Sequence, residues 1–66
     1  MAMHRRIYVD MAKMFDTARY LAETEGERLV VRDLAVGFAN YAAEDNHAFK
    51  RDKFLRAAGF PELAAN

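Results

Sequence analysis

Apolar residues recur at steps of three and four along the first third of the chain, which is the period of an α-helix with one buried face. Within residues 3–25 these positions are Met3, Ile7, Met11, Met14, Phe15, Ala18, Leu21 and Ala22. At 100° per residue they fall within an arc of about 120°, and Lys13, Asp16 and Glu23 point away from it. Gly26 predicts the end of this helix, because glycine readily adopts the left-handed conformation found past helix ends.

A second periodic segment covers residues 28–45 and is apolar on two sides. Its main face is formed by Val30, Val31, Leu34, Ala35, Phe38, Tyr41 and Ala42, and a further strip on the far side by Leu29, Val36, Ala39 and Ala43. A helix that is apolar on two sides is expected to be buried on two sides. In so short a chain, the second side must meet either a third helix or a second copy of the protein.

A third, shorter helix is predicted for residues 51–58, after a break at Asp45-Asn46-His47. Phe49 and Phe54 have the spacing of a hydrophobic staple around Lys50, the residue expected to precede this helix. The helix is expected to end at Gly59, followed by an apolar Phe60 and by Pro61, which cannot continue it. The pattern therefore predicts an all-α fold, a compact three-helix domain over residues 1–66, with residues 61–66 as a tail that forms at most one further turn.

Chain length and surplus apolar surface both favour self-association. A domain of this size buries only about 60% of the surface that its unfolded chain exposes, and the chain has no cysteine to add disulfides. Val9 and Tyr20 lie with Ala12 on the charged side of the first helix and add to the apolar strip of the second. We therefore expect a homodimer, with an interface made of Val9, Tyr20, Leu29, Val36, Ala39 and Ala43.

The apolar runs are too short for a membrane segment. They reach three or four residues, as at Leu29-Val30-Val31, whereas a helix needs about 20 to span a bilayer. Asp10, Lys13 and Asp16 also interrupt any run of signal-peptide length near the N-terminus. We expect no membrane partner and a location in the cytosol.

The residue types needed for most kinds of catalysis are missing or scattered. The chain has no serine, no cysteine and two histidines, His4 and His47, so Ser and Cys nucleophilic triads are excluded. Glu23, Glu25 and Glu27 surround Gly26 without the ligand spacing of a calcium loop, and we interpret them as a solvated acidic turn. We expect no catalytic residue, no metal site and no cofactor.

A cationic cluster near the C-terminus is the main candidate for partner binding. Lys50, Arg51, Lys53 and Arg56 surround a single acidic residue, Asp52. On a helical wheel Lys50, Lys53 and Arg56 form a stripe opposite the apolar side, which is either a solvated outer face or a site for an acidic protein surface or for nucleic-acid phosphates. The ten cations and ten anions of the chain balance, and zero net charge favours a protein partner over DNA. The turn near Gly26 does not fit a helix-turn-helix, since the core position expected after it falls on Arg32.

Residues 45–59, which read Asp-Asn-His-Ala-Phe-Lys-Arg-Asp-Lys-Phe-Leu-Arg-Ala-Ala-Gly, resemble a C-terminal signature of small uncharacterised proteins of tailed phages and prophages. Those proteins read roughly Asp-Asn-Pro-x-Phe-Asp-Arg-x-Arg-Phe-Leu-x-Ala-Cys-Gly, usually after an amphipathic helix. His47, Lys50 and Ala58 depart from that pattern, and Lys50 removes a helix cap worth about 1 kcal/mol. The resemblance implies no activity. It is compatible with a protein that binds and inhibits a host defence or regulatory protein, with a nucleic-acid-binding accessory as the alternative.

Overall fold

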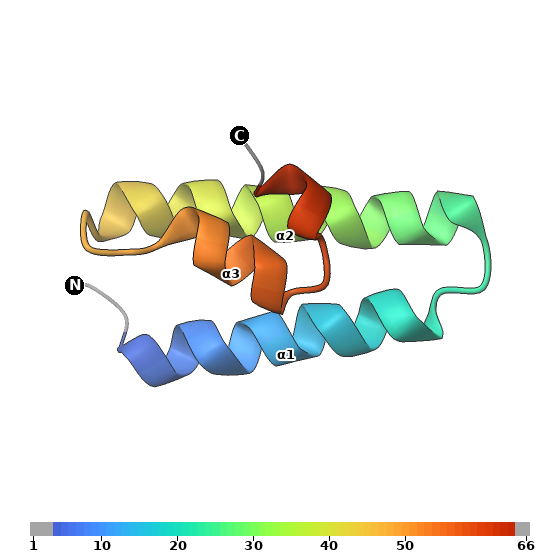
Figure 1. The fold of residues 1–66 in the computed structure, drawn as a ribbon, viewed down its shortest axis with the longest axis horizontal. Coiled ribbons are helices and arrows are strands. Elements are labelled where there is room, and N and C mark those ends of the chain that lie inside the picture. The colour runs from blue at the N-terminus through green and yellow to red at the C-terminus, as the bar shows by residue number, and fades with distance from the viewer. Residues whose placement is uncertain (1–3, 65–66) are drawn as a thin grey trace.

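The fold is a pair of long antiparallel helices covered on one side by a shorter third helix (Figure 1). The computed structural model describes residues 4–64 and contains α1 (Arg5–Leu21), α2 (Glu25–Asp45), α3 (Arg51–Ala57) and the 3₁₀ turn η1 (Pro61–Leu63). Its Cα atoms form a slab of 36 × 24 × 15 Å. The three-helix, all-α prediction is confirmed, although Met3 lies outside the described residues. No helix in this part of the chain is long and apolar enough to cross a bilayer.

The connection between α1 and α2 differs from the prediction. α1 ends at Leu21 rather than near Gly26, and Gly26 lies inside the first turn of α2. Thr24 caps α2, because its Oγ1 accepts a hydrogen bond of 3.1 Å from the Glu27 backbone N–H, while the Glu27 carboxylate accepts one of 2.7 Å from the Glu23 N–H. The Thr-x-x-Glu spacing is that of a capping box, which outweighs a glycine as a boundary signal. The acidic turn is therefore a helix start, with Glu25 and Glu27 at the positive end of the helix dipole.

The two ends of α3 follow the sequence closely. Lys50 precedes the helix and makes no side-chain cap, and the staple residues Phe49 and Phe54 lie with ring centroids 5.6 Å apart. At the other end Gly59 has φ +95°, and the Phe60 and Gly59 N–H groups donate to the Leu55 and Arg56 carbonyls at 2.9 and 3.1 Å. This is the paired hydrogen bonding of a Schellman motif, as the Gly-Phe-Pro stop signal predicted.

The core is built from small residues on the long helices and large ones on the C-terminal segment. Among the described residues, the buried set is Tyr8, Ala12, Ala35, Ala39, Ala42, Phe54, Leu55, Ala58, Phe60 and Ala64. Six of these ten are alanines, which let the helices approach closely. The larger apolar side chains of the α1–α2 pair that pack against this core are only partly buried: Met11, Phe15, Val31, Val36 and Phe38.

The buried face of α1 is not the stripe that the periodicity singled out. Tyr8 and Ala12 are buried, whereas Ile7, Met14 and Leu21 are exposed. The expectation that Ala12 lies on the outer side of α1 is thus wrong. Because α3 packs against α1 as well as α2, the buried arc of α1 is rotated by roughly a quarter of a turn toward α3.

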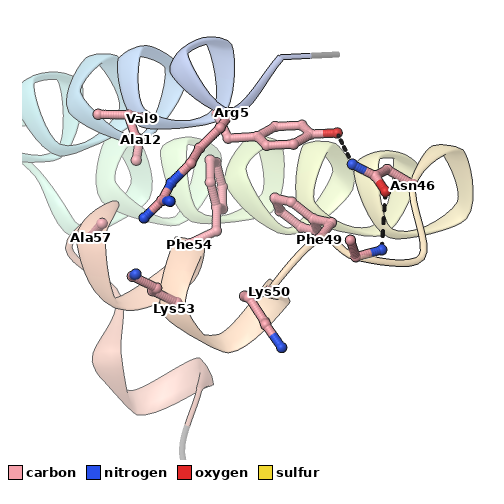
Figure 2. Close-up of a pocket in the computed structure, with 11 residues that line it drawn as sticks. Arg5, Val9, Ala12, Asn46, Phe49, Lys50, Lys53, Phe54 and Ala57 are labelled. Atoms are coloured by element: carbon pink, nitrogen blue, oxygen red, sulfur yellow. Dashed lines mark hydrogen bonds between the residues drawn. The ribbon is translucent and has the colours of Figure 1, made fainter. Parts of the chain in front are cut away.

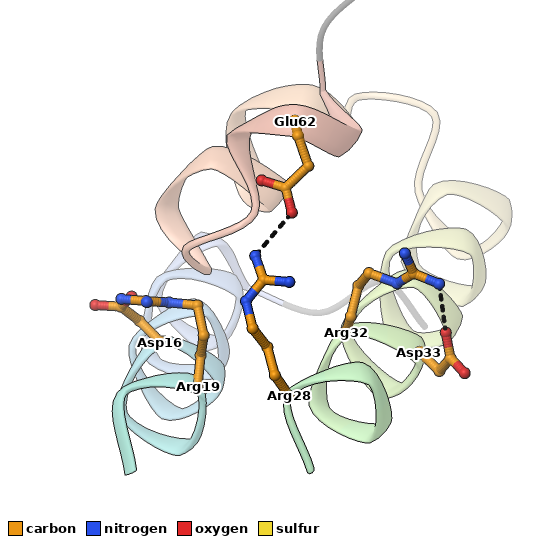
Figure 3. A network of polar contacts seen from close by, with 6 residues as sticks. All are labelled: Asp16, Arg19, Arg28, Arg32, Asp33 and Glu62. Carbon is orange, nitrogen blue, oxygen red and sulfur yellow. Dashed lines mark hydrogen bonds and ion pairs between the residues drawn. The ribbon is translucent and has the colours of Figure 1, made fainter. Parts of the chain in front are cut away.

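The segment predicted as a tail is part of the fold. Pro61–Leu63 form η1, and Phe60 and Ala64 are buried on either side of it. Arg28 of α2 holds this segment, since its guanidinium lies 5.3 Å from the centroid of the Phe60 ring and 3.0 Å from the Glu62 carboxylate (Figure 3). Residues 65 and 66 lie outside the described part of the chain.

Candidate functional site

A cleft of about 420 Å³ lies between the first half of α1 and the segment that enters α3 (Figure 2). Its floor is apolar and includes Tyr8 and Ala12 from α1 together with Phe49 and Phe54 from the C-terminal segment. Three cationic side chains, those of Arg5, Lys50 and Lys53, complete the lining, and no Asp or Glu belongs to it. The cleft therefore offers an apolar surface within a positively charged surround.

The cations of the cleft come from two parts of the chain that are far apart in sequence. Lys50 and Lys53 stand one helical turn apart at the start of α3, and Arg5 opens α1. Figure 2 shows the Arg5 side chain extending from α1 toward α3. The next residue, Arg6, does not line the cleft. Its Nε lies 3.7 Å from the Asp10 Oδ2 in an exposed ion pair. The cleft lining thus carries three cations and no anion, a distribution that favours an anionic group of a partner.

Aromatic packing and one asparagine fix the floor. The Tyr8 and Phe49 rings lie 4.6 Å apart at an interplanar angle of 59°, a tilted arrangement that aromatic pairs favour. The Asn46 side chain donates to the Tyr8 hydroxyl at 3.4 Å and accepts from the Ala48 N–H at 3.0 Å. Asn46 thereby links the α2–α3 turn to α1 at one end of the cleft.

The four cations predicted for partner binding all line one shallow depression on α3, but only two of them also line the cleft. Lys50 and Lys53 line the cleft, whereas Arg51 donates to Asn40 of α2 at 2.9 Å and serves to hold α3. Arg56 is exposed in this depression, whose lining also includes Phe49 and the acidic Asp52. Arg5 and Arg6 could both extend the basic patch if α1 starts near α3, a neighbourhood that the sequence leaves open; in the fold Arg5 lines the cleft and Arg6 does not.

The six residues predicted as a dimer interface do not form one exposed surface. Ala39 is wrong, because its side chain is fully buried in the core of the single chain. Val36 also packs against the core, and Val9 lines the cleft. Ala43 is half-buried, whereas Leu29 and Tyr20 are exposed.

The larger apolar surface lies on the side of the slab away from α3. Its exposed residues are Ile7, Met14 and Leu21 on α1 and Val30, Leu34 and Tyr41 on α2, which we call the open face. On α1 these positions lie roughly 140–180° around the helix from Arg5 and Ala12, which face α3. On α2 they lie about 80° or more from Asn40, which contacts Arg51 of α3. Within the described residues the molecule thus has two distinct surfaces, a charged cleft and an apolar face.

Comparison of the chain with protein-family models, with curated proteins and with solved structures finds no match. Among residues 4–64 no group of three or more His, Asp or Glu side chains is placed to hold a metal ion.

Proposed function

We propose that this protein acts by binding another protein, and that the cleft takes an apolar side chain from an acidic segment of that partner. The observation that carries the proposal is the composition of the cleft: Tyr8, Phe49 and Phe54 form its floor, Arg5, Lys50 and Lys53 supply its charge, and no carboxylate lines it. An aliphatic or aromatic side chain buried against the floor would supply contact area, and flanking Asp or Glu residues would pair with the cations.

A nucleic-acid partner is the second candidate, because cations beside aromatic residues also characterise single-strand binding sites. Such sites stack bases on open ring faces. Here Tyr8 and Phe54 are 9% and 4% exposed and their rings pack against neighbouring aromatic rings, so that Phe49 alone of the three retains partly exposed ring surface. This lack of a stacking platform, together with zero net charge, favours the protein partner.

The setting that we propose is a phage or mobile element, on the strength of the resemblance of residues 45–59 to phage proteins. Within that setting, the protein would inhibit a host defence or regulatory protein in the host cytosol. Inhibition by occupying a partner's surface needs no catalytic group, which agrees with a chain that has no serine or cysteine nucleophile.

Selection from a displayed random-peptide library tests the binding proposal. Peptides that bind the unmodified protein should carry Asp or Glu beside a leucine, isoleucine or phenylalanine. They should lose affinity for the double variant Lys50→Glu/Lys53→Glu and keep it for Lys13→Glu, a charge reversal at an exposed position of α1 outside the cleft. Selection of basic peptides, or equal loss with Lys13→Glu, would contradict the proposal.

The nucleic-acid alternative has its own readout in the salt dependence of binding. If the cations contact phosphates, the affinity for DNA should fall with salt by about one logarithmic unit per neutralised phosphate, and Lys53→Ala should reduce that slope by about one. A sub-micromolar, salt-sensitive complex with single-stranded or duplex DNA at physiological ionic strength would replace the protein partner by this alternative.

A further inference from the structure

We propose that a second copy of this chain covers the open face, so that two α1–α2 pairs pack together and leave each cleft on an outer side. This surface differs from the interface that the sequence pattern predicted. It also does not depend on what the cleft binds.

The distribution of large side chains points to an incomplete core. Among its described residues the single chain buries four large apolar side chains, those of Tyr8, Phe54, Leu55 and Phe60, and its other buried residues are alanines. Seven more apolar residues, Phe15 and Phe38 among them, pack against this core but are only partly buried. The open face meanwhile carries six large apolar residues on two neighbouring helices, of which Met14, Val30, Leu34, Tyr41 and Leu21 are each at least 60% exposed. Chains of this size commonly complete a small core by association.

The size and charge of the open face suit a second copy. A stable interface buries about 800 Å² on each partner, or about a sixth of the 4806 Å² accessible surface of this chain. The broad side of the slab, 36 Å long and 24 Å wide, is large enough for that area. None of the six residues is charged, and the ten cations and ten anions of the chain leave no net repulsion between copies. An apolar patch that is complementary to itself is what a two-fold dimer requires.

Gly37 is a second, independent indication of a close neighbour. It lies in the middle of α2, one turn from Leu34 and from Tyr41, and is exposed. A Cβ at this position would have no side chain or neighbouring element within 4 Å, so nothing in the single chain requires a glycine there. Glycine weakens a helix interior relative to alanine, whereas it allows a helix of another molecule to approach closely.

Sedimentation equilibrium of the full chain from about 5 to about 200 µM tests the proposal. The unmodified protein should form a dimer within this range, with dissociation to monomer at its lower end. Leu34→Glu and Met14→Glu should raise the dimer dissociation constant at least about a hundredfold, because the two-fold symmetry places each charge in the interface twice. Circular dichroism should show that both variants keep their helices, since both side chains are exposed in the single chain.

Tyr20→Glu is the matched control. Tyr20 is 80% exposed on α1 but lies about 120° around the helix from Met14, so this variant should remain a dimer. Gly37→Ala should weaken the dimer at least about tenfold while making the dissociated chain more resistant to heat. A monomer at all concentrations, dissociation by Tyr20→Glu but not by Leu34→Glu, or an unchanged dissociation constant in Gly37→Ala would each overturn the proposal.

Discussion

The two sides of the α1–α2 pair differ in how their apolar residues are used. On the side covered by α3, alanines of the long helices meet the large side chains of Phe54, Leu55 and Phe60, and the contact is closed within one chain. On the open face the large side chains belong to the long helices themselves and are exposed in the single chain. On our proposal, the apolar stripe of the open face meets a second copy of the chain, whereas the other side meets a helix of the same chain.

The largest expected effect comes from removing the side chain that closes the covered side. Phe60 is fully buried, so Phe60→Ala should lower the free energy of unfolding by about 3–5 kcal/mol. For a domain of this size that is a large part of the total stability, and the variant should be largely unfolded near room temperature. Urea unfolding monitored by circular dichroism measures the loss. A loss below about 1 kcal/mol would mean that the C-terminal segment is not part of the core.

A pair of leucines compares the two sides directly. Leu55→Ala should lower the free energy of unfolding by about 2–5 kcal/mol at any protein concentration, because Leu55 is fully buried in the single chain. Leu34 is 60% exposed, so Leu34→Ala should lower the free energy of unfolding only slightly at a protein concentration of a few micromolar or below. The loss should grow as the protein concentration rises, because association stabilises the folded state. Chemical denaturation at two concentrations measures both. Equal, concentration-independent losses would remove the distinction between the two sides.

Gly59 tests the tightness of the covered side. Its φ of +95° disfavours any side chain, and a Cβ there would collide with the Asp16 and Arg19 side chains, which form a 2.8 Å ion pair on α1. Gly59→Ala should therefore lower the free energy of unfolding by about 2 kcal/mol. Gly26→Ala is the control. Gly26 lies in a helical turn, where a Cβ would meet only the Thr24 Oγ1 at an ordinary contact distance of 3.8 Å, so this substitution should not lower the free energy of unfolding. Equal thermal shifts in the two variants would contradict this account of α3.

Lys50 connects stability with the cleft. An aspartate at this position would accept hydrogen bonds from the first turn of α3 and should stabilise the protein by about 1 kcal/mol. Lys50→Asp should at the same time lower the affinity for acidic peptides, because it replaces a cation of the cleft by an anion. Lys50→Asn separates the two effects, since it supplies the cap without the negative charge. Unchanged peptide affinity in Lys50→Asp would show that Lys50 takes no part in binding.

The smallest expected effect concerns Glu62 and pH. A hydrogen bond from its own backbone N–H lowers the pKa of the Glu62 carboxyl, partial desolvation opposes this, and the Arg28 guanidinium lowers the pKa further. A carboxyl with a lowered pKa in the folded state contributes stability above its ordinary pKa, and loses it as the pH falls through the lowered value. Glu62→Gln should therefore show a slightly shallower fall in thermal stability below about pH 4.5. Identical pH profiles of thermal stability in Glu62→Gln and the unmodified protein would show that the Glu62 carboxylate does not stabilise the packing of η1.

How far the sequence is informative depends on the range of the signals. The start of α3 at the Phe49–Phe54 staple and its end at Gly59 were predicted correctly, because capping and stop signals act over a few residues. The start of α2 is encoded in the same way by Thr24 and Glu27, but the nearby glycine competes with them as a boundary signal. Arg5 and Tyr8 became part of the cleft only through the packing of α3 on α1, which no local pattern encodes.

The orientation of α1 was mispredicted for a related reason. The periodicity correctly found a stripe through Ile7, Met14 and Leu21, but it cannot say whether such a stripe meets α3, α2 or another molecule. The residues expected at the dimer interface included Ala39, which the fold uses for its own core. The apolar surplus is visible in the sequence, whereas its position required the structure.

A dilution series followed by two-dimensional NMR tests most directly the claim that one side is closed within the chain and the other by a second copy. Between about 1 mM and about 10 µM, the signals of Ile7, Met14, Leu34 and Tyr41 should shift together along one dimerisation curve. Those of Phe49, Lys53 and Phe60 should stay in place. Spectra that do not change with concentration, or changes confined to α3 and the cleft, would contradict the account.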